Sequence, residues 1–231
     1  WKGKSGLNLY ADLVMETDAV VGQVVDAIDA AGIADNTVVI FTSDNGCAPY
    51  IGIADLEKMG HDPSGPLRGA KSDVWEGGHR VPFIAAWGDG TQTGSRIPPG
   101  SRNDQLIAGQ DLYATFAELS GQPTGPDQGL DSWSILPALL GEKTTSRRDH
   151  LVVQANQRGL AHVRSGESYQ RKSGKAQQYK ALREGPWKLV VNATAGSPEG
   201  LYDLETDLQE QENLIANPES AARVAAMMKR Y

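Results

Sequence analysis

Apolar residues near the start of the chain recur at the spacing of an amphipathic helix. The stripe consists of Tyr10, Leu13, Val14, Thr17, Val21, Val24, Val25 and Ile28. Because residues on one face of an α-helix recur with this period, the pattern predicts a helix over residues 9–31 with one apolar side. Asn8 or Ser5 can cap its start, and Gly32 lies just beyond its end.

Two short apolar runs, residues 37–42 and 81–87, follow this helix and are typical of buried strands. A helix that leads directly into a buried strand forms half of a βαβ unit. We therefore expect the two strands to be parallel neighbours, with the helix packed on their sheet. Shorter segments come next, namely a strand over 105–108 and helices over 111–119 and 129–141.

The pattern changes near residue 144, after which strand-like runs alternate with turns. Residues 179–183 and 187–191 flank Glu184-Gly185-Pro186, an arrangement typical of a β-hairpin. The other expected elements are strands over 151–153 and 200–204, a mobile polar loop over 164–177 and a last helix from Pro218.

These elements predict an α/β fold in two parts. Residues 1–143 are expected to belong to a parallel-sheet α/β domain. Residues 144–231 are expected to form a small α+β subdomain with an antiparallel sheet and a terminal helix, because the strands come first and a helix follows to cover them.

Composition and charge argue against several classes of function. A net charge of −7 and a pI near 5.1 leave no basic field to attract the phosphates of a nucleic acid. No apolar run approaches the roughly 20 residues of a membrane span. The single cysteine, Cys47, cannot form an intramolecular disulfide. The chain begins at Trp1 without a signal peptide, so we expect it to be part of a longer protein.

Candidate metal ligands follow the first predicted strand. Asp44-Asn45-Gly46 offers a carboxylate beside an amide oxygen, and both are hard ligands suited to Ca²⁺ or Mg²⁺. Ligands of open α/β sheets bind beyond the carboxyl ends of the strands, which is where these residues are expected. An Asp-Asn-Gly turn needs no metal, however, and on these three residues alone the turn is the simpler interpretation.

Longer motifs favour the metal site over the simple turn. Asp44-Asn45-Gly46 is followed by Pro66-Leu67-Arg68-Gly69-Ala70-Lys71 and then by Glu76-Gly77-Gly78-His79-Arg80-Val81-Pro82. Together these segments resemble the second half of the sulfatases, the type I sulfate-ester hydrolases of the alkaline-phosphatase superfamily. The resemblance extends through nearly the whole chain, to residues 129–141, Leu201-Tyr202-Asp203-Leu204 and Glu212-Asn213-Leu214.

The resemblance implies roles for particular residues. Asp44 and Asn45 would bind a divalent cation, usually Ca²⁺, and Lys71 would contact the sulfate group and offset charge that develops on its oxygens. Residues 46–74 form a long irregular segment, which is usually functional when it occurs inside a compact domain. His61 in this segment is a further candidate for substrate contact.

Three neighbouring side chains have structural interpretations instead. Arg68 is expected to brace the loop or the metal carboxylates through its several donors. Glu76 and Arg80 are expected to form a structural ion pair, and His79 is interpreted as a packing residue.

The nucleophile of the family is absent from this chain. Sulfatases oxidise the Cys or Ser of a Cys-x-Pro-Ser/Ala-Arg segment to formylglycine. Cys47-Ala48-Pro49 imitates its start, but Tyr50 and Ile51 replace the last two residues, and the family's nucleophile precedes the Asp-Asn pair. We therefore interpret Cys47 as an incidental thiol. The formylglycine and the remaining metal ligands are expected before Trp1, and this chain alone is expected to be inactive.

The resemblance implies that the whole protein hydrolyses sulfate monoesters of an aryl, carbohydrate or lipid group, and that it is exported to a periplasmic, secreted or lysosomal location. One alternative is another enzyme of the same superfamily, such as a phosphodiesterase or a phosphonate hydrolase. A second alternative is a non-catalytic binding module. The nucleophile encoded upstream of Trp1 distinguishes these three hypotheses.

Overall fold

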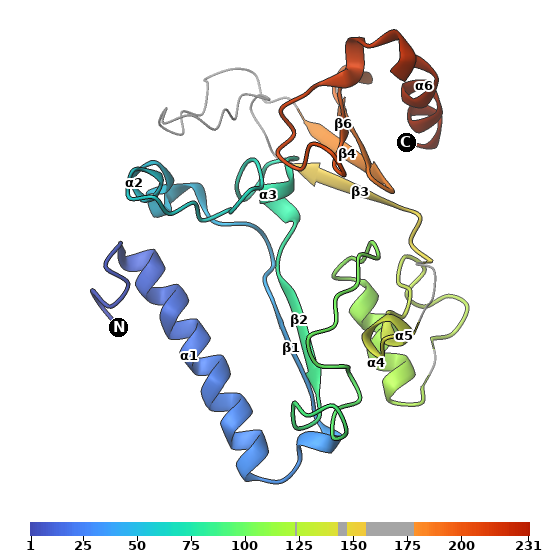
Figure 1. The fold of residues 1–231 in the computed structure, drawn as a ribbon. Coiled ribbons are helices and arrows are strands. Elements are labelled where there is room, and N and C mark those ends of the chain that lie inside the picture. The colour runs from blue at the N-terminus through green and yellow to red at the C-terminus, as the bar shows by residue number, and fades with distance from the viewer. Residues whose placement is uncertain (123, 143–146, 156–177) are drawn as a thin grey trace. The chain divides into compact units, whose positions relative to one another are not determined.

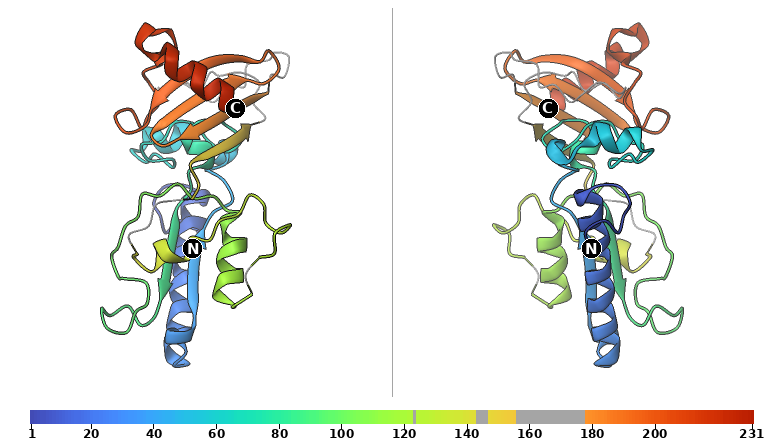
Figure 2. Two further views of the ribbon diagram at one scale, coloured as in Figure 1. Left: turned by 90° about the vertical axis from the view of Figure 1, so that its right-hand side faces the viewer. Right: turned by 90° about the vertical axis from the view of Figure 1, so that its left-hand side faces the viewer.

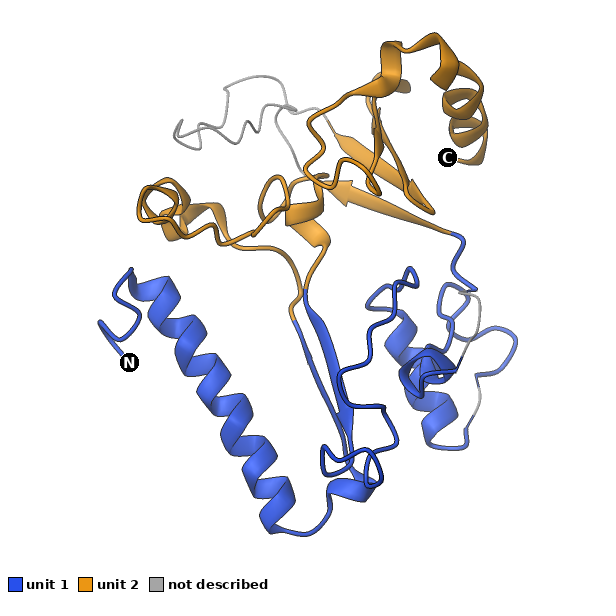
Figure 3. Cartoon of the chain, in the orientation of Figure 1, with its two compact units in different colours: residues 1–42, 82–149 blue, residues 43–81, 150–231 orange. Residues whose placement is uncertain are grey.

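The computed structural model describes residues 1–122, 124–142, 147–155 and 178–231. The chain divides into two compact units (Figure 3). Unit 1 contains residues 1–42 and 82–149, and unit 2 contains residues 43–81 and 150–231. The segment 43–81, which carries the motifs described above, thus groups with the C-terminal residues. The domain boundary proposed at residues 143 and 144 concerns the whole protein and stays a prediction.

The predicted N-terminal helix is confirmed as α1, Leu9–Ala30 (Figure 1). Asn8 caps its start, because the Asn8 side chain accepts a hydrogen bond of 3.0 Å from the main-chain N–H of Ala11. Gly32 follows the end of the helix with a φ of +66°, a left-handed conformation that favours glycine. The chain then passes through the 3₁₀ turn η1, Ala34–Asn36, into β1, Val38–Thr42.

The prediction of two parallel strands in unit 1 was wrong. β1 pairs with β2, Phe83–Trp87, in an antiparallel register that runs from Val38 opposite Trp87 to Thr42 opposite Phe83. Parallel strands need a connection that crosses back along the sheet, whereas an antiparallel pair needs the chain to return beside the end that it left. Residues 43–82 make the second kind of connection, since Thr42 and Phe83 are partners.

The predicted packing of the helix on this sheet was also wrong. The apolar stripe of α1 is largely exposed, with Leu13 at 57% and Val14 at 50% of full exposure. The helical period was therefore detected correctly, but the two-stranded sheet does not cover the stripe. A pair of strands is too narrow to bury a helix of six turns.

The rest of unit 1 contains two helices, α4, Asp111–Leu119, and α5, Leu136–Leu139. The first confirms its prediction, whereas the helix predicted over 129–141 is reduced to the single turn α5. The predicted strand over 105–108 was wrong, because this segment has an irregular conformation and leads into α4. Its last N–H, at Ala108, donates to the carboxylate of Asp111 at 2.8 Å.

Unit 2 is built on a four-stranded antiparallel sheet (Figure 2). Its strands, in spatial order, are β3, His150–Ala155, β4, Tyr179–Glu184, β5, Trp187–Asn192, and β6, Ser197–Asp203. The predicted hairpin is confirmed as β4 and β5, and Gly185 in its turn has a φ of +55°. The loop predicted over 164–177 lies outside the described residues.

Each face of this sheet packs against a different part of unit 2. On one face, the side chains of Leu182, Leu189, Val191 and Leu201 form a core with Met227 of α6, Ala221–Arg230. On the other face, Ala181, Val190 and Tyr202 pack against Val74 and Trp75. The alternation of side chains along β5 explains the division, since successive residues point to opposite faces.

Short helices interrupt the segments that connect these elements. Those in the segment 43–81 are η2, Pro49–Ile51, α2, Ile53–Lys58, and α3, Glu76–His79. Before α6 the chain forms η3, Leu214–Ala216, and η4, Pro218–Ser220. Sequence periodicity did not predict the three in the segment 43–81, because helices of three to six residues are too short to show a period. No helix in the described part of the chain is long and apolar enough to cross a membrane.

Candidate active site

Three short segments, 44–47, 68–71 and 75–78, lie side by side in unit 2. Main-chain hydrogen bonds join them: Gly46 N–H to Gly78 O (3.0 Å), Gly77 N–H to Arg68 O (2.7 Å) and Lys71 N–H to Cys47 O (2.9 Å). The three motifs of the sequence are thus joined directly, and Asp44, Asn45 and Lys71 belong to one cluster of loops.

The glycines in these segments are required by the close approach of the main chains. A Cβ atom at Gly46 would overlap the carbonyl oxygen of Gly77, and a Cβ atom at Gly77 would overlap that of Arg68. Gly69 has a φ of +83°, so it needs glycine for its conformation as well as for space. The residue type at each position therefore follows from how tightly the loops pack.

Asp44 and Asn45 offer two oxygen ligands. The side-chain amide of Asn45 donates to the carbonyl oxygen of Gly46 at 3.1 Å, and the Oγ of Ser43 donates to the carbonyl oxygen of Asn45 at 2.9 Å. Within the described residues, neither the Asp44 carboxylate nor the Asn45 side-chain oxygen has a protein partner. These two oxygens fit a hard cation such as Ca²⁺, which takes 6–8 oxygen ligands. They are too few for a complete site, and the described residues hold no cluster of three His, Cys, Asp or Glu that could bind a metal.

Lys71 is half-buried and its main chain is held by Cys47, while the ammonium has no hydrogen-bond or ion-pair partner in the described ranges. Its charge is therefore available to an anion. His61 follows α2, where its N–H donates to the carbonyl oxygen of Leu56 at 2.9 Å. No hydrogen bond among the described residues joins His61 to Lys71, so its role in substrate contact stays a prediction.

Cys47 has the surroundings of an unreactive thiol. Its Sγ lies 3.2 Å from the Oγ of Ser64, which itself donates to the carbonyl oxygen of Gly69 at 3.0 Å. Burial raises the pKa of the Cys47 thiol, which disfavours the nucleophilic thiolate. These surroundings support its interpretation as an incidental thiol.

A buried group of charges lies beneath the three loops. The carboxylate of Glu76 is almost fully buried, and it forms ion pairs with Lys188 at 3.1 Å, Arg183 at 2.9 Å and Arg80 at 3.2 Å. The predicted pair with Arg80 is thus confirmed. The two partners from the sheet were missed, although Lys188 gave a signal in the sequence, because it is a lone charge in the apolar run of β5.

Glu210 is a second buried carboxylate that the sequence analysis missed. One of its oxygens lies 2.8 Å from the ammonium of Lys188, and the other accepts the main-chain N–H of Glu76 at 2.7 Å. The carbonyl oxygen of Glu210 accepts a hydrogen bond of 2.6 Å from Arg68. The guanidinium of Arg68 also stacks on Trp75, 3.7 Å from the ring centroid. The prediction that Arg68 braces the loop is therefore confirmed.

The ionisation of this group follows from burial and charge together. Burial alone would raise the pKa of Glu76, but the positive charge of Lys188 and its other cationic neighbours lowers that pKa to about 2. Burial raises the pKa of Glu210, because the ion pair with Lys188 only partly offsets desolvation. Burial and the nearby Lys188 charge lower the pKa of His79 to about 4. His79 is thus neutral near pH 7, which suits the packing role predicted for it.

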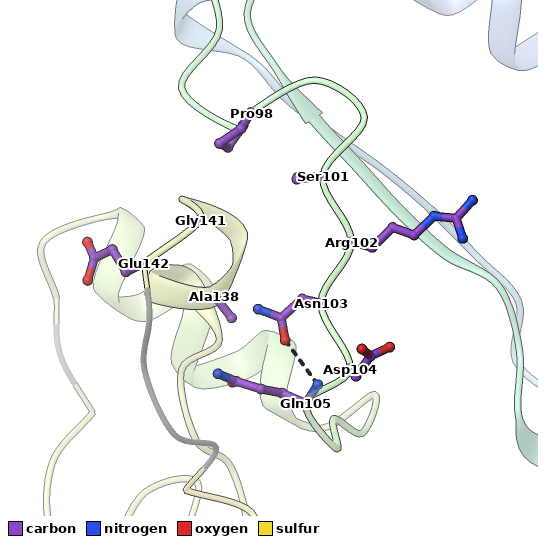
Figure 4. Close-up of a pocket in the computed structure, with 9 residues that line it drawn as sticks. All are labelled: Pro98, Ser101, Arg102, Asn103, Asp104, Gln105, Ala138, Gly141 and Glu142. Carbon is purple, nitrogen blue, oxygen red and sulfur yellow. Dashed lines mark hydrogen bonds between the residues drawn. The ribbon is translucent and has the colours of Figure 1, made fainter. Parts of the chain in front are cut away.

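A pocket of about 610 Å³ lies in unit 1 (Figure 4). Its wall includes Arg102, Asn103, Gln105 and Glu142, and the side chain of Asn103 accepts a hydrogen bond of 3.0 Å from the N–H of Gln105. None of the candidate site residues lines this pocket.

Comparison with known proteins identifies the family. The model of the family described as Sulfatase matches residues 2–122, just over half of the 231 residues. This chain belongs to the sulfatase family. It is 32% identical to an N-acetylgalactosamine-6-O-sulfatase of Bacteroides thetaiotaomicron over 98% of its length, and 32% identical to human arylsulfatase A over 92%. The chain spans about two fifths of these relatives, 42% and 40% of their lengths.

Solved structures support the fold. A protein solved in complex with its substrate D-glucosamine-2-N,6-O-disulfate aligns with 96% of this sulfatase chain at a TM-score of 0.69 and 20% identity, and the alignment covers 38% of that protein. The phosphonate monoester hydrolase of Agrobacterium radiobacter aligns with 96% at a TM-score of 0.63 and 22% identity, over 39% of its length. The predicted α/β class with a C-terminal antiparallel sheet and terminal helix is confirmed, while likeness of fold alone does not separate the two chemistries.

We expect Gly46→Ala to destabilise unit 2 by about 1–3 kcal/mol, because the added methyl group overlaps a main-chain carbonyl that cannot rotate away. Denaturant unfolding of the purified chain measures the change. Gly109→Ala is the matched control, since a Cβ atom at Gly109 meets no atom within 4 Å. Equal unfolding midpoints for the two variants would contradict the close approach.

We expect the titration of His79 to lower the free energy of unfolding as the pH falls from 6.5 toward 4, whereas the raised pKa of Glu210 acts in the opposite direction. The pKa of His79 is depressed in the folded state, so the unfolded chain binds more protons in this interval and folding loses stability as pH falls. Below about 4.5 the depressed pKa of Glu76 adds a second loss in the same direction. His79→Gln, which cannot titrate, should flatten the dependence between pH 6.5 and 4. Denaturation at a series of pH values tests this, and an unchanged slope in the variant would refute the assignment.

Proposed function

We propose that the whole protein is a sulfuric ester hydrolase that uses a formylglycine nucleophile and a calcium ion. Asp44 and Asn45 are the calcium ligands that this chain supplies, and Lys71 binds the sulfate group. One observation carries the proposal: main-chain hydrogen bonds bring into one loop cluster two side-chain oxygens and an ammonium that have no partner among the described residues. This arrangement occurs in a chain of the sulfatase family.

The roles of the residues follow from charge. The carboxylate of Asp44 and the amide oxygen of Asn45 hold the cation, which when bound supplies positive charge beside the sulfate. The ammonium of Lys71 donates hydrogen bonds to the sulfate oxygens and offsets the charge that develops as the ester bond breaks. Because its main chain is fixed to Cys47, Lys71 is held ready for this role before the substrate arrives.

The remaining parts of the site belong to the rest of the protein in this proposal. The chain spans about two fifths of its relatives, 42% and 40% of their lengths, and the formylglycine and the other calcium ligands are assigned to the part outside it. That part also covers the exposed apolar stripe of α1. We further propose that the whole protein is exported, which a signal peptide in its full gene would test.

The substrate is an aryl, carbohydrate or lipid sulfate. Sulfated carbohydrates are the first class to assay, because one relative is named for N-acetylgalactosamine 6-O-sulfate and one structural neighbour holds a sulfated glucosamine. His61 is proposed to contact the substrate from the same segment.

A second candidate function is phosphonate ester hydrolysis, because a phosphonate monoester hydrolase shares this fold. Turnover of p-nitrophenyl sulfate and of p-nitrophenyl phenylphosphonate by the whole protein separates the two. A faster reaction with the sulfate supports the proposal, and a faster reaction with the phosphonate overturns it. Turnover of neither ester favours the non-catalytic binding module.

In the whole protein, we expect Lys71→Ala to lower kcat for p-nitrophenyl sulfate by roughly 10²–10³, the usual effect of losing one preorganised donor at a developing charge. The fold should persist, because the Lys71 side chain makes no hydrogen bond or ion pair with the residues that the structure describes. Lys58→Ala is the matched control, since Lys58 lies in the same segment and is exposed, with an ion pair to Asp55 at 3.0 Å. Equal kcat values for the two variants would show that Lys71 is an ordinary surface lysine without a role in catalysis.

We expect the 231-residue chain alone to bind Ca²⁺ weakly or not at all, because two ligands satisfy only part of the coordination that calcium takes. It should also fail to turn over p-nitrophenyl sulfate, since it holds no activated nucleophile. Isothermal titration and a turnover assay measure the two properties. Micromolar affinity that survives Asp44→Ala would place the metal elsewhere, and turnover would make Cys47 the nucleophile.

A further inference from the structure

The ion pair of Lys188 and Glu210 lies entirely inside unit 2. The two side chains are 1% and 0% exposed, and their charged atoms are 2.8 Å apart. Lys188 is on the face of β5 that packs against Val74 and Trp75, which is the face beneath the candidate site. A lysine in this position occupies a place that an apolar side chain could fill.

Lys188 and Glu210 attach both ends of the segment that contains Lys71, the far end through their side chains and the near end through the main chain of Glu210. At the far end, Glu210 accepts the N–H of Glu76, where α3 begins, and Lys188 binds the carboxylate of Glu76. At the near end, the carbonyl oxygen of Glu210 accepts a hydrogen bond from Arg68. Lys71 lies between these two attachments, and its main-chain N–H donates to the carbonyl oxygen of Cys47 in the loop 44–47.

Stability alone does not account for this arrangement. Removing two charges from water is costly, and a buried ion pair is often no more stabilising than well-packed apolar side chains of similar volume. The apolar contacts of Trp75 already attach the segment to the sheet. Hydrogen bonds and ion pairs are directional, whereas apolar contacts are not. They therefore attach the segment and also fix its position on the sheet.

We propose that Lys188 and Glu210 are positioning residues of the active site, which set the placement of Lys71 from the opposite end of the chain. The inference rests on the proposed function. Neither side chain touches the substrate, so their effect on catalysis passes through Lys71. Displacing a catalytic group by about 1 Å can cost on the order of 10² in rate.

The first experiment compares two variants of the whole protein, Lys188→Met and Leu189→Ala. Leu189 is the next residue of β5, is fully buried and points to the opposite face, so its truncation destabilises the same strand without touching the ion pair. At a temperature where circular dichroism shows both variants folded, Lys188→Met should lose about 10²-fold in kcat. Leu189→Ala should stay within about threefold of the original protein, since it lies on the face away from the site. Equal losses would show that only stability matters and overturn the proposal.

A double-mutant cycle tests whether the effect passes through Lys71. If Lys188 acts by positioning, Lys71→Ala should reduce kcat far less in the Lys188→Met protein than in the original, because the misplaced ammonium no longer contributes. If Lys71→Ala instead lowered kcat by the same factor in both proteins, the two residues would act independently and the proposal would be overturned. If Lys188→Met does not fold, the cycle is run with Glu210→Gln, which keeps an oxygen acceptor for the N–H of Glu76 and replaces the charged oxygen that faces Lys188 with a neutral amide group.

A thiol measurement separates failure of this inference from failure of the proposed function. Cys47 is the single cysteine of the 231-residue chain, and its carbonyl oxygen holds Lys71. Labelling of Cys47 by Ellman's reagent should be at least tenfold faster in Lys188→Met than in Leu189→Ala, since the loops separate only when the ion pair is lost. If no ester is hydrolysed but labelling differs in this way, the positioning survives and the function is wrong. Equal labelling rates would overturn the positioning itself.

Discussion

A carboxylate that is removed from water must be surrounded by donors and cations, and Glu76 imposes this requirement on unit 2. Its partners Arg183 and Lys188 come from neighbouring strands of the sheet, and its own N–H is bound by Glu210. The partners of this one buried charge therefore connect a loop motif, two strands and the segment after β6. The sheet thus fixes the position of the loops that carry the candidate site residues.

Close approach of main chains is the second constraint, and it explains the composition of the site motifs. Gly46, Gly77 and Gly78 allow three loops to hydrogen bond directly, which leaves the carboxylate of Asp44, the side-chain oxygen of Asn45 and the ammonium of Lys71 unengaged by protein groups in the described part of the chain. Rigid main chain beneath and unengaged polar side chains above are what preorganised binding of a charged ligand requires. The same glycines leave little tolerance for substitution.

Local features of the fold were predictable from sequence, while long-range ones were not. The helix that ends before Gly32 and the hairpin around Gly185 follow from period and turn chemistry, which depend on near neighbours. The antiparallel pairing of β1 with β2 was missed, because it depends on the path taken by residues 43–82.

The candidate site divides in the same way. Asp44, Asn45 and Lys71 were found because their motifs resemble those of a family, and the structure joins their loops. The pairing of Lys188 and Glu210 with Glu76 was missed because they lie 112 and 134 residues from it, and the lone charge of Lys188 in an apolar strand does not indicate its partner.

That separation has a consequence for biosynthesis. A chain emerging from the ribosome presents residues 44–78 well before Lys188 and Glu210 exist, so the loop motifs cannot reach their final arrangement until the last strands have been made. Until then Glu76 has no buried place to occupy and its segment stays hydrated. A polypeptide that ends before residue 210 therefore carries Asp44, Asn45 and Lys71 but lacks the groups of Glu210 that bind Arg68 and the main-chain N–H of Glu76.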